Sequence, residues 1–194
     1  MARPALPPWP AIPPQHGAVL LRAVRLDDVA MARELSTDPY VQMTGTLPLN
    51  ATDDDAAAWV RRQQGRHAEG AGFSFTITDV ASRAPVGHCG LWLRELPRGH
   101  GSAGYSIAPS ARGRGLAADA LRALTAFGWS LPGLARVALY IEPWNVASLR
   151  TAERAGYVRD LLLRDHEVGE GVRRDVLRYV ATRHEHPPTR QEEG

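Results

Sequence analysis

The chain of 194 residues contains no lysine, so every side chain that is fully cationic at neutral pH is an arginine. Without lysine there is no phosphate-binding loop of the Gly-Lys-Ser/Thr type, no Schiff-base catalyst and no lysine general base. Function classes that depend on those groups are therefore excluded.

Cysteine and long apolar runs are also scarce. The single Cys89 cannot form an internal disulfide or a multi-cysteine zinc site, so we expect no metal and a reducing cytoplasm as the location. No apolar run approaches the roughly 20 residues that a membrane-spanning helix needs. Residues 1–15 carry six prolines and lack the apolar core of a secretory signal, so we expect an extended arm there.

Neither sign of charge is in large excess. The chain has 23 basic and 21 acidic residues without a long basic stripe, so neither nucleic acid nor membrane is a predicted partner. Hydrophobic residues make up 44% of the sequence and charged residues 23%, which is typical of folded rather than disordered chains. We therefore expect a folded, soluble protein.

The order of elements predicts one α/β domain. No repeat or composition break divides residues 17–182, which follow a Pro-rich arm at residues 1–16 and precede a polar tail at residues 183–194. Asp27 is expected to cap the first helix, which ends before Pro39. Helices are expected over residues 27–38, 52–67, 116–131 and 146–155, and strands over residues 19–25, 73–79, 85–95, 102–107, 137–141, 157–166 and 172–182.

A glycine-rich segment joins a strand to an amphipathic helix, and it reads Ile107-Ala108-Pro109-Ser110-Ala111-Arg112-Gly113-Arg114-Gly115-Leu116-Ala117. The first amides of a helix lack intrahelical partners, and glycines let the chain curl so that these amides converge on one anion. Arg112 and Arg114 add positive charge. The segment is therefore predicted to bind a pyrophosphate on the backbone of residues 112–117, although an ordinary glycine-rich turn has the same composition.

The same loop also fits a dinucleotide-binding fingerprint. Residues 113–118 follow the pattern GxGxxA, and Glu142 stands at the end of the next strand, where a ribose-binding acid belongs. Against this, residues 108–112 separate the strand from the first glycine, and consecutive strands rather than repeated βαβ units precede the loop. An NAD-binding oxidoreductase is therefore kept only as a remote alternative.

Four further motifs accompany the loop: Gly104-Tyr105, Asn145-x-x-Ser148, Ala155-Gly156-Tyr157 and Arg174-Asp175-Val176-x-x-Tyr179. Together with Arg112-x-x-Gly115-x-Ala117, they resemble the GCN5-related N-acetyltransferases, and among them the ribosomal-protein-alanine (RimJ/RimL-like) subgroup. The resemblance covers residues 19–182. It implies a mixed, mostly antiparallel sheet with helices on both faces, splayed between the strands at Gly104 and Val137.

The resemblance also implies a cofactor, which is acetyl-CoA or another acyl-CoA inserted into the splay. The backbone of Ile107 and Ala108 would hold its pantetheine arm, and Asn145 and Ser148 would reach the same arm and the thioester sulfur. The amides expected to take the pyrophosphate are those of Arg112, Gly113, Arg114, Gly115, Leu116 and Ala117. Dimerisation is common in the family, and whether this chain forms a homodimer is left open.

The implied reaction is direct transfer of an acyl group to an amine, either a protein N-terminus or a small molecule. Ser148 is the candidate proton donor to sulfur, and its alternative is a plain first-turn serine; Asn145 could equally be a helix cap. Glu142 is the candidate base because Ser102 stands where the subgroup often has an acid, and its alternative is an exposed glutamate at a strand end.

Two other expectations follow. Tyr105, His88 and Cys89 are expected to be packing residues, so a covalent Cys–His mechanism is not favoured. Because the acid is missing at Ser102, a non-catalytic acyl-CoA-binding or regulatory module remains the alternative to an N-acetyltransferase.

Overall fold

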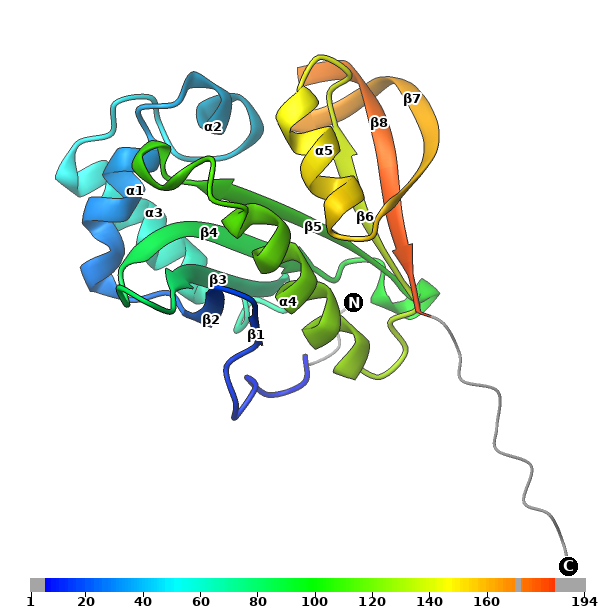
Figure 1. Cartoon of the computed structure of the whole chain (residues 1–194), viewed down its shortest axis with the longest axis horizontal. Coiled ribbons are helices and arrows are strands. Elements are labelled where there is room, and N and C mark those ends of the chain that lie inside the picture. The colour runs from blue at the N-terminus through cyan, green and yellow to red at the C-terminus, as the bar shows by residue number, and fades with distance from the viewer. Residues whose placement is uncertain (1–5, 170–171, 184–194) are drawn as a thin grey trace, which may run out of the picture.

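The predicted strands form one mixed sheet in the computed structural model, which describes residues 6–169 and 172–183 (Figure 1). The strand order is β1-β2-β3-β4-β5-β6-β8-β7. The strands are β1 (Gln15–His16), β2 (Val19–Ala23), β3 (Gly72–Asp79), β4 (Pro85–Trp92), β5 (His100–Ile107), β6 (Arg136–Ile141), β7 (Val158–Gly169) and β8 (Val172–Thr182). Every neighbouring pair in the described part of the chain is antiparallel except β5 with β6, so the predicted mostly antiparallel architecture is confirmed.

The parallel pair is short. β5 and β6 are in register only from His100 opposite Arg136 to Ser102 opposite Ala138. Beyond that point the two strands separate, and Figure 1 shows β6 and β8 leaning away from β5. The predicted splay between the strands that carry Gly104 and Val137 is therefore present.

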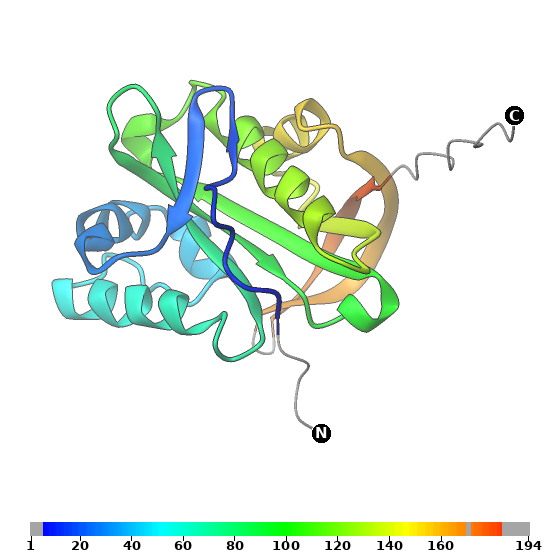
Figure 2. The same cartoon turned by 90° about the horizontal axis from the view of Figure 1, so that it is seen from below.

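Helices cover both faces of the sheet (Figures 1 and 2). The helices are α1 (Val29–Leu35), α2 (Pro39–Thr44), α3 (Asp53–Gly65), α4 (Leu116–Ser130) and α5 (Val146–Arg154), with short 3-10 turns η1 (Leu26–Asp28), η2 (Leu96–Arg98) and η3 (Pro109–Ala111). On one face Phe127 of α4 packs edge-on against Phe73 and Phe75 of β3. On the other face Trp59 of α3 contacts His88 of β4. Each face thus has its own apolar core.

The segment between the first two long helices contains an element that the sequence reading missed. The first helix was expected to end before Pro39 with no helix before residue 52, yet Pro39 is the first residue of α2. Asp38 caps this helix by accepting a hydrogen bond from the Tyr40 amide at 2.8 Å. Proline is tolerated there because N–H groups in the first turn of a helix have no acceptor within the helix, so the N–H that proline lacks is not needed.

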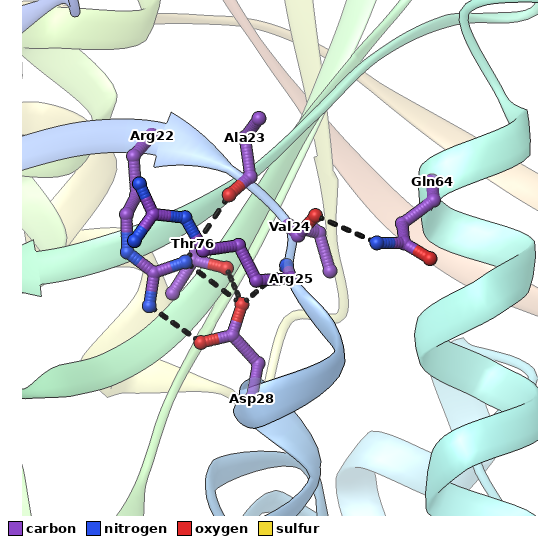
Figure 3. A network of polar contacts seen from close by, with 7 residues as sticks. All are labelled: Arg22, Ala23, Val24, Arg25, Asp28, Gln64 and Thr76. Carbon is purple, nitrogen blue, oxygen red and sulfur yellow. Dashed lines mark hydrogen bonds and ion pairs between the residues drawn. The ribbon is translucent and has the colours of Figure 1, made fainter.

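The expected cap at Asp27 is wrong by one residue, because the buried Asp28 makes the contacts and Asp27 is exposed. The Asp28 carboxylate accepts hydrogen bonds from both terminal nitrogens of Arg22, from the Arg25 amide at 2.8 Å and from the Thr76 hydroxyl at 2.6 Å (Figure 3). Burial alone would raise the pKa of Asp28, but these hydrogen bonds together hold it below its usual value. This carboxylate joins β2, η1 and β3.

Residues 6–16 of the Pro-rich arm pack on the domain that follows them. Trp9 lies edge-on to Phe73 and Phe75, and the Pro7 carbonyl lies 2.8 Å from Nε2 of His67. Figure 2 shows this segment crossing a face of the sheet. The domain boundary at residue 16 stays a prediction, and residues 184–194 of the predicted tail lie outside the described residues. No helix of the described segments is long and apolar enough to cross a membrane.

Replacing Asp28 should destabilise the fold strongly. Asp28→Ala leaves the Arg22 guanidinium without its partner, and losing one member of such a buried pair costs about 3 kcal/mol. Because the pKa of Asp28 is lower in the folded state, its contribution is present above the ordinary carboxyl pKa of about 4 and is lost as pH falls through the lower folded pKa. Urea unfolding at neutral pH measures the loss, with the exposed neighbour Asp27→Asn as control. Equal unfolding midpoints for the two variants would contradict this role.

Candidate active site

The splay leaves two strand edges without a partner strand. Ala108 N–H donates to the Val86 carbonyl of β4 at 2.9 Å, and successive residues of a strand point their backbone groups to opposite sides. The N–H groups of Tyr105 and Ile107 therefore point toward the gap. On β6, Arg183 N–H donates to the Ala135 carbonyl, so every second residue of the strand from Ala135 onward bonds to β8. Tyr140 is one of the residues in between, and its backbone N–H and carbonyl therefore point toward the gap. An extended chain that carries amides could pair with either edge.

This geometry changes one expectation about the backbone contacts. Both backbone groups of Ala108 are used inside the protein, since its carbonyl accepts from Ala111 N–H at 2.9 Å. Ile107 keeps a free N–H, whereas its carbonyl accepts a hydrogen bond from Arg112 Nε at 3.0 Å. Of the two predicted pantetheine contacts, only Ile107 therefore has a free N–H, whereas Ala108 could contribute only the second lone pair of its carbonyl.

Two cavities lie at the gap and meet there. The α4 cavity, of about 400 Å³, is lined by the glycine loop, the first turn of α4 and α5. The α3 cavity, of about 580 Å³, is lined by α2, α3, β4, β5 and the ends of β6 to β8. The residues common to both linings are Tyr40, Val41, Tyr105, Ser106 and Ser148. A ligand in one cavity can therefore touch a ligand in the other near Ser148.

The glycine loop has the backbone of an anion site. Gly113 and Gly115 have φ of +77° and +79°, a region that other residues rarely adopt. A Cβ at either position would meet no atom within 4 Å, so the space in front of the loop is open. Gly115 precedes the first residue of α4 without a side-chain cap, and no hydrogen bond in the described segments uses the amides of residues 113–117. These amides are free to bind an anion.

The two loop arginines line the α4 cavity, and each also forms an ion pair. Arg112 forms an ion pair with Asp38 at 2.5 Å, and Arg114 forms one with Asp79. The hydrogen bond from Arg114 is the main cause that lowers the pKa of Asp79. Both guanidinium groups thus hold the loop in shape rather than leaving their charge unpaired. The positive charge that sequence analysis missed is on α5, where Arg150 and Arg154 line the α4 cavity at a spacing of one helical turn.

The start of α5 brings Asn145 and Ser148 to the junction of the two cavities. Asn145 Oδ1 accepts a hydrogen bond from Ser148 N–H at 3.1 Å, so Asn145 is a helix cap in this structure, and its side chain also faces the Tyr40 hydroxyl. The Tyr105 hydroxyl is buried beside Ser148 and Thr151, without a partner at hydrogen-bonding geometry. Burial raises the pKa of Tyr105, and these two hydroxyls act weakly in the opposite direction.

Glu142 is not the exposed glutamate that the sequence alternative allowed, since it is 4% exposed. Its Oε1 pairs with Arg174 of β8 at 3.0 Å, and its Oε2 is buried without a hydrogen-bond partner. Glu142 lines the α3 cavity together with Ser102, the position where an acid was looked for. Tyr40 lies beside Glu142, and its pKa is raised chiefly by burial and further by this carboxylate.

The adjacent His88 and Cys89 point to opposite faces of β4. His88 lines the α3 cavity, whereas Cys89 is 0% exposed in the core beneath α4. Burial raises the pKa of the Cys89 thiol and lowers that of His88 to about 3. The pair therefore has neither the geometry nor the protonation states of a Cys–His nucleophile.

The protein family described as "Acetyltransferase (GNAT) domain" matches residues 18–158 of this chain. The chain belongs to the GNAT acetyltransferase family. The N-acetyltransferase p20 of Bacillus licheniformis, named as uncharacterized, is 24% identical over 166 residues, which are 86% of this chain and 93% of that protein. The family supports acyl-CoA-dependent N-acetyltransferase activity.

Solved structures of other GNAT proteins share the fold. A GNAT acetyltransferase from Bacillus anthracis superposes with a TM-score of 0.74 at 19% identity, covering 88% of this chain and 98% of that one. RimJ of Mycobacterium smegmatis, in complex with CoA-disulfide, gives 0.73 at 21% identity, covering 90% and 88%. With a mostly antiparallel sheet and no repeated βαβ units among the described residues of this GNAT domain, the NAD-binding alternative loses its structural basis.

The burial of Cys89 leads to a direct test. The thiol of the native GNAT domain should remain unmodified by an aromatic disulfide reagent at pH 8, because its pKa is raised and no reagent reaches it. After unfolding in guanidinium chloride the same thiol should react at once. Absorbance of the released thiolate measures both. Rapid labelling of the folded protein would show that Cys89 is accessible and reopen a nucleophilic role.

Proposed function

We propose that this GNAT domain transfers the acetyl group of acetyl-CoA to a primary amine by direct transfer in a ternary complex. The observation that carries the proposal is the meeting of two cavities at Ser148, one with an anion-binding loop and the other with a buried carboxylate. A cofactor in the α4 cavity and an acceptor in the α3 cavity would face each other across the gap. Holding the thioester and the amine next to each other in the right orientation supplies a large part of the rate acceleration in such a transfer.

The residues that line the α4 cavity fit CoA. The free amides of residues 113–117 suit its pyrophosphate, and the open edge of β5 at Tyr105 and Ile107 suits its two amide groups. Arg150 and Arg154 add exposed positive charge on the same side. When bound, acetyl-CoA supplies a thioester-activated acetyl group, so that one C–N bond forms as one C–S bond breaks.

The protein itself must provide for two proton transfers, one to the leaving sulfur and one from the attacking amine. Ser148 Oγ is the proposed donor toward the sulfur, since it lies at the junction of the two cavities. Glu142 Oε2 is the proposed acceptor of the amine proton, directly or through water, because this buried oxygen has no other partner. Asn145 positions Ser148 through the cap of α5, and its own amide can reach the pantetheine arm.

A non-catalytic acyl-CoA-binding module is the second candidate, favoured by Ser102 in place of an acid. It predicts CoA binding without turnover of any amine. Acetyl as the acyl group, a cytoplasmic location and an acceptor that is either a protein N-terminus or a small-molecule amine stay predictions as well, and the homodimer stays an open question.

Gly115→Ala should weaken CoA binding through the backbone alone. An alanine at φ of +79° is strained, and the loop would relax away from the shape that gathers its amides. We expect about a tenfold rise in the dissociation constant for CoA, measured by titration calorimetry. Gly133→Ala is the matched control, because Gly133 has φ of +78° and open space but lies in a turn remote from the cavities. Equal CoA affinity in both variants would refute the loop assignment.

Ser148→Ala and Glu142→Gln should each lower kcat by about 100-fold, at the lower end of what acid–base groups contribute. The affinity for CoA should stay within a factor of about three, since neither residue is assigned to the pyrophosphate. Release of the free thiol from acetyl-CoA with a panel of amines measures kcat. Ser130→Ala at the end of α4 and the exposed Glu95→Gln are controls. Unchanged kcat in both site variants would remove these residues from the mechanism.

A further inference from the structure

The floor of the α3 cavity is an aromatic side chain laid over two glycines. Gly90 and Gly104 are paired across β4 and β5, and a Cβ on either would come within 2.9 Å and 3.1 Å of the Trp92 ring. These glycines therefore make room for the indole on the α3 face of the sheet. The guanidinium carbon of Arg66, on the turn after α3, lies 5.9 Å from the centre of that ring. A cation over tryptophan is held in place without losing its charge.

Positive side chains gather at this floor. Arg66 Nε donates to Gln63 Oε1 at 2.7 Å, and Arg94 follows Trp92 and lines the same cavity. Burial is the main cause that lowers the pKa of Arg66; Glu69 opposes this shift, and Arg62 and Arg94 act in the same direction as burial. Arg94 has no ion pair among residues 6–169 and 172–183. Two arginines that line one cavity favour the binding of an anion there.

A buried histidine points to a ligand independently of the arginines. His88 is 8% exposed and lines the α3 cavity, and its Nε2 has no hydrogen-bond partner. Unpartnered buried polar atoms are uncommon, because each costs the free energy of a lost hydrogen bond. With a pKa lowered to about 3, the ring is neutral at physiological pH and offers one donor and one acceptor.

The aromatic floor and the candidate base lie at different levels of the gap. Trp92 is opposite Ser102, and its indole reaches to the level of Gly104, two residues further along β5. Continuing the register of β5 with β6 puts Gly104 level with Tyr140, so Glu142 lies two residues, or roughly 7 Å, beyond the ring along the strand direction. An acceptor that fills the cavity would present different chemistry at its two ends.

We propose that the acceptor is a small primary amine carrying a carboxylate or phosphate group, which Arg66 and Arg94 bind beside Trp92 while the amine lies near Glu142. The inference rests on the proposed function and deepens it by naming the class of acceptor. A polycationic amine would meet like charges at the floor, and an uncharged amine would gain no charge-assisted hydrogen bond from either arginine. Anionic amines should therefore be selected over both.

Matched acceptors of one length separate these classes. Aminohexanoate and aminohexyl phosphate carry an anion, aminohexanol is neutral at the same end, and diaminohexane is cationic there. We expect kcat/KM for at least one anionic amine to exceed that of the neutral amine by about tenfold, the effect of one charge-assisted hydrogen bond. The carboxylate and phosphate arms show which anion is preferred.

Charge-removing variants then locate the selectivity. Arg94→Gln and Arg66→Gln should each raise KM for the anionic amine by about tenfold and leave kcat/KM for the neutral amine within about twofold. Arg98→Gln is the control, because Arg98 follows on the same segment but is 77% exposed and pairs with Glu95 outside the cavity. Arg94 is exposed, so its variant should fold even if Arg66→Gln does not.

Binding to CoA-saturated protein, followed by titration calorimetry, tests the inference apart from turnover. The anionic amines should bind and the neutral and cationic ones should bind at least about tenfold more weakly. Equal or tighter binding of the neutral or cationic amine, or selectivity untouched by both arginine variants, would overturn the proposed acceptor class. CoA binding with selective binding of anionic amines but no thiol release would instead overturn the catalytic proposal and leave this inference standing.

Discussion

The site depends on the early end of the pairing between β5 and β6. Three residues of each strand are in register, and after Ser102 and Ala138 each strand is held only by its outer neighbour. β5 remains paired with β4 up to Ile107, and β6 remains paired with β8 up to Ile141. Because these outer ladders satisfy half of the backbone groups, the inner edges can stay open without the strands unfolding. The opening joins a cavity on the α4 face to one on the α3 face.

The loop beside this opening is shaped before any ligand arrives. Arg112 reaches back to the Ile107 carbonyl and across to Asp38, and Arg114 reaches Asp79 at the end of β3. The glycines supply the φ values, and the arginines fix the loop to two distant elements. A loop held in this way does not have to be ordered on binding, which saves conformational entropy. It also explains why backbone amides rather than guanidinium groups face the space in front of α4.

Sequence patterns predicted the parts of the fold that local periodicity determines. The apolar stripe of α4, the helix over residues 53–65 and the strand preceding the glycine loop lie where they were expected. α2 was missed because Pro39 was taken as the end of a helix, although the same residue can begin one. The choice between Asp27 and Asp28 depended on Arg22 and Thr76, which become neighbours only when β2 and β3 pair.

The side chains of the α3 cavity were harder to predict for the same reason. Glu142 is buried because Arg174 of β8 lies against it, and Arg66, His88 and Trp92 come together from a turn and a strand that are distant in the sequence. A usable signal existed in the two glycines at Gly90 and Gly104, since facing glycines in paired strands indicate that a large group lies over them.

The two cavities therefore offer different kinds of groups to a ligand. The α4 cavity uses backbone amides and strand edges, which many sequences can provide once the glycines are present. The α3 cavity uses particular side chains, and part of its lining comes from His166, Glu167 and Val176, which lie beyond residues 18–158 that match the family. Solved GNAT structures at 19% to 21% identity share this fold. In this chain the proposed acceptor side combines the buried Glu142 carboxylate with Arg66 over Trp92 and with Arg94, and this unequal distribution of charge would orient a molecule that carries an amine and an anion.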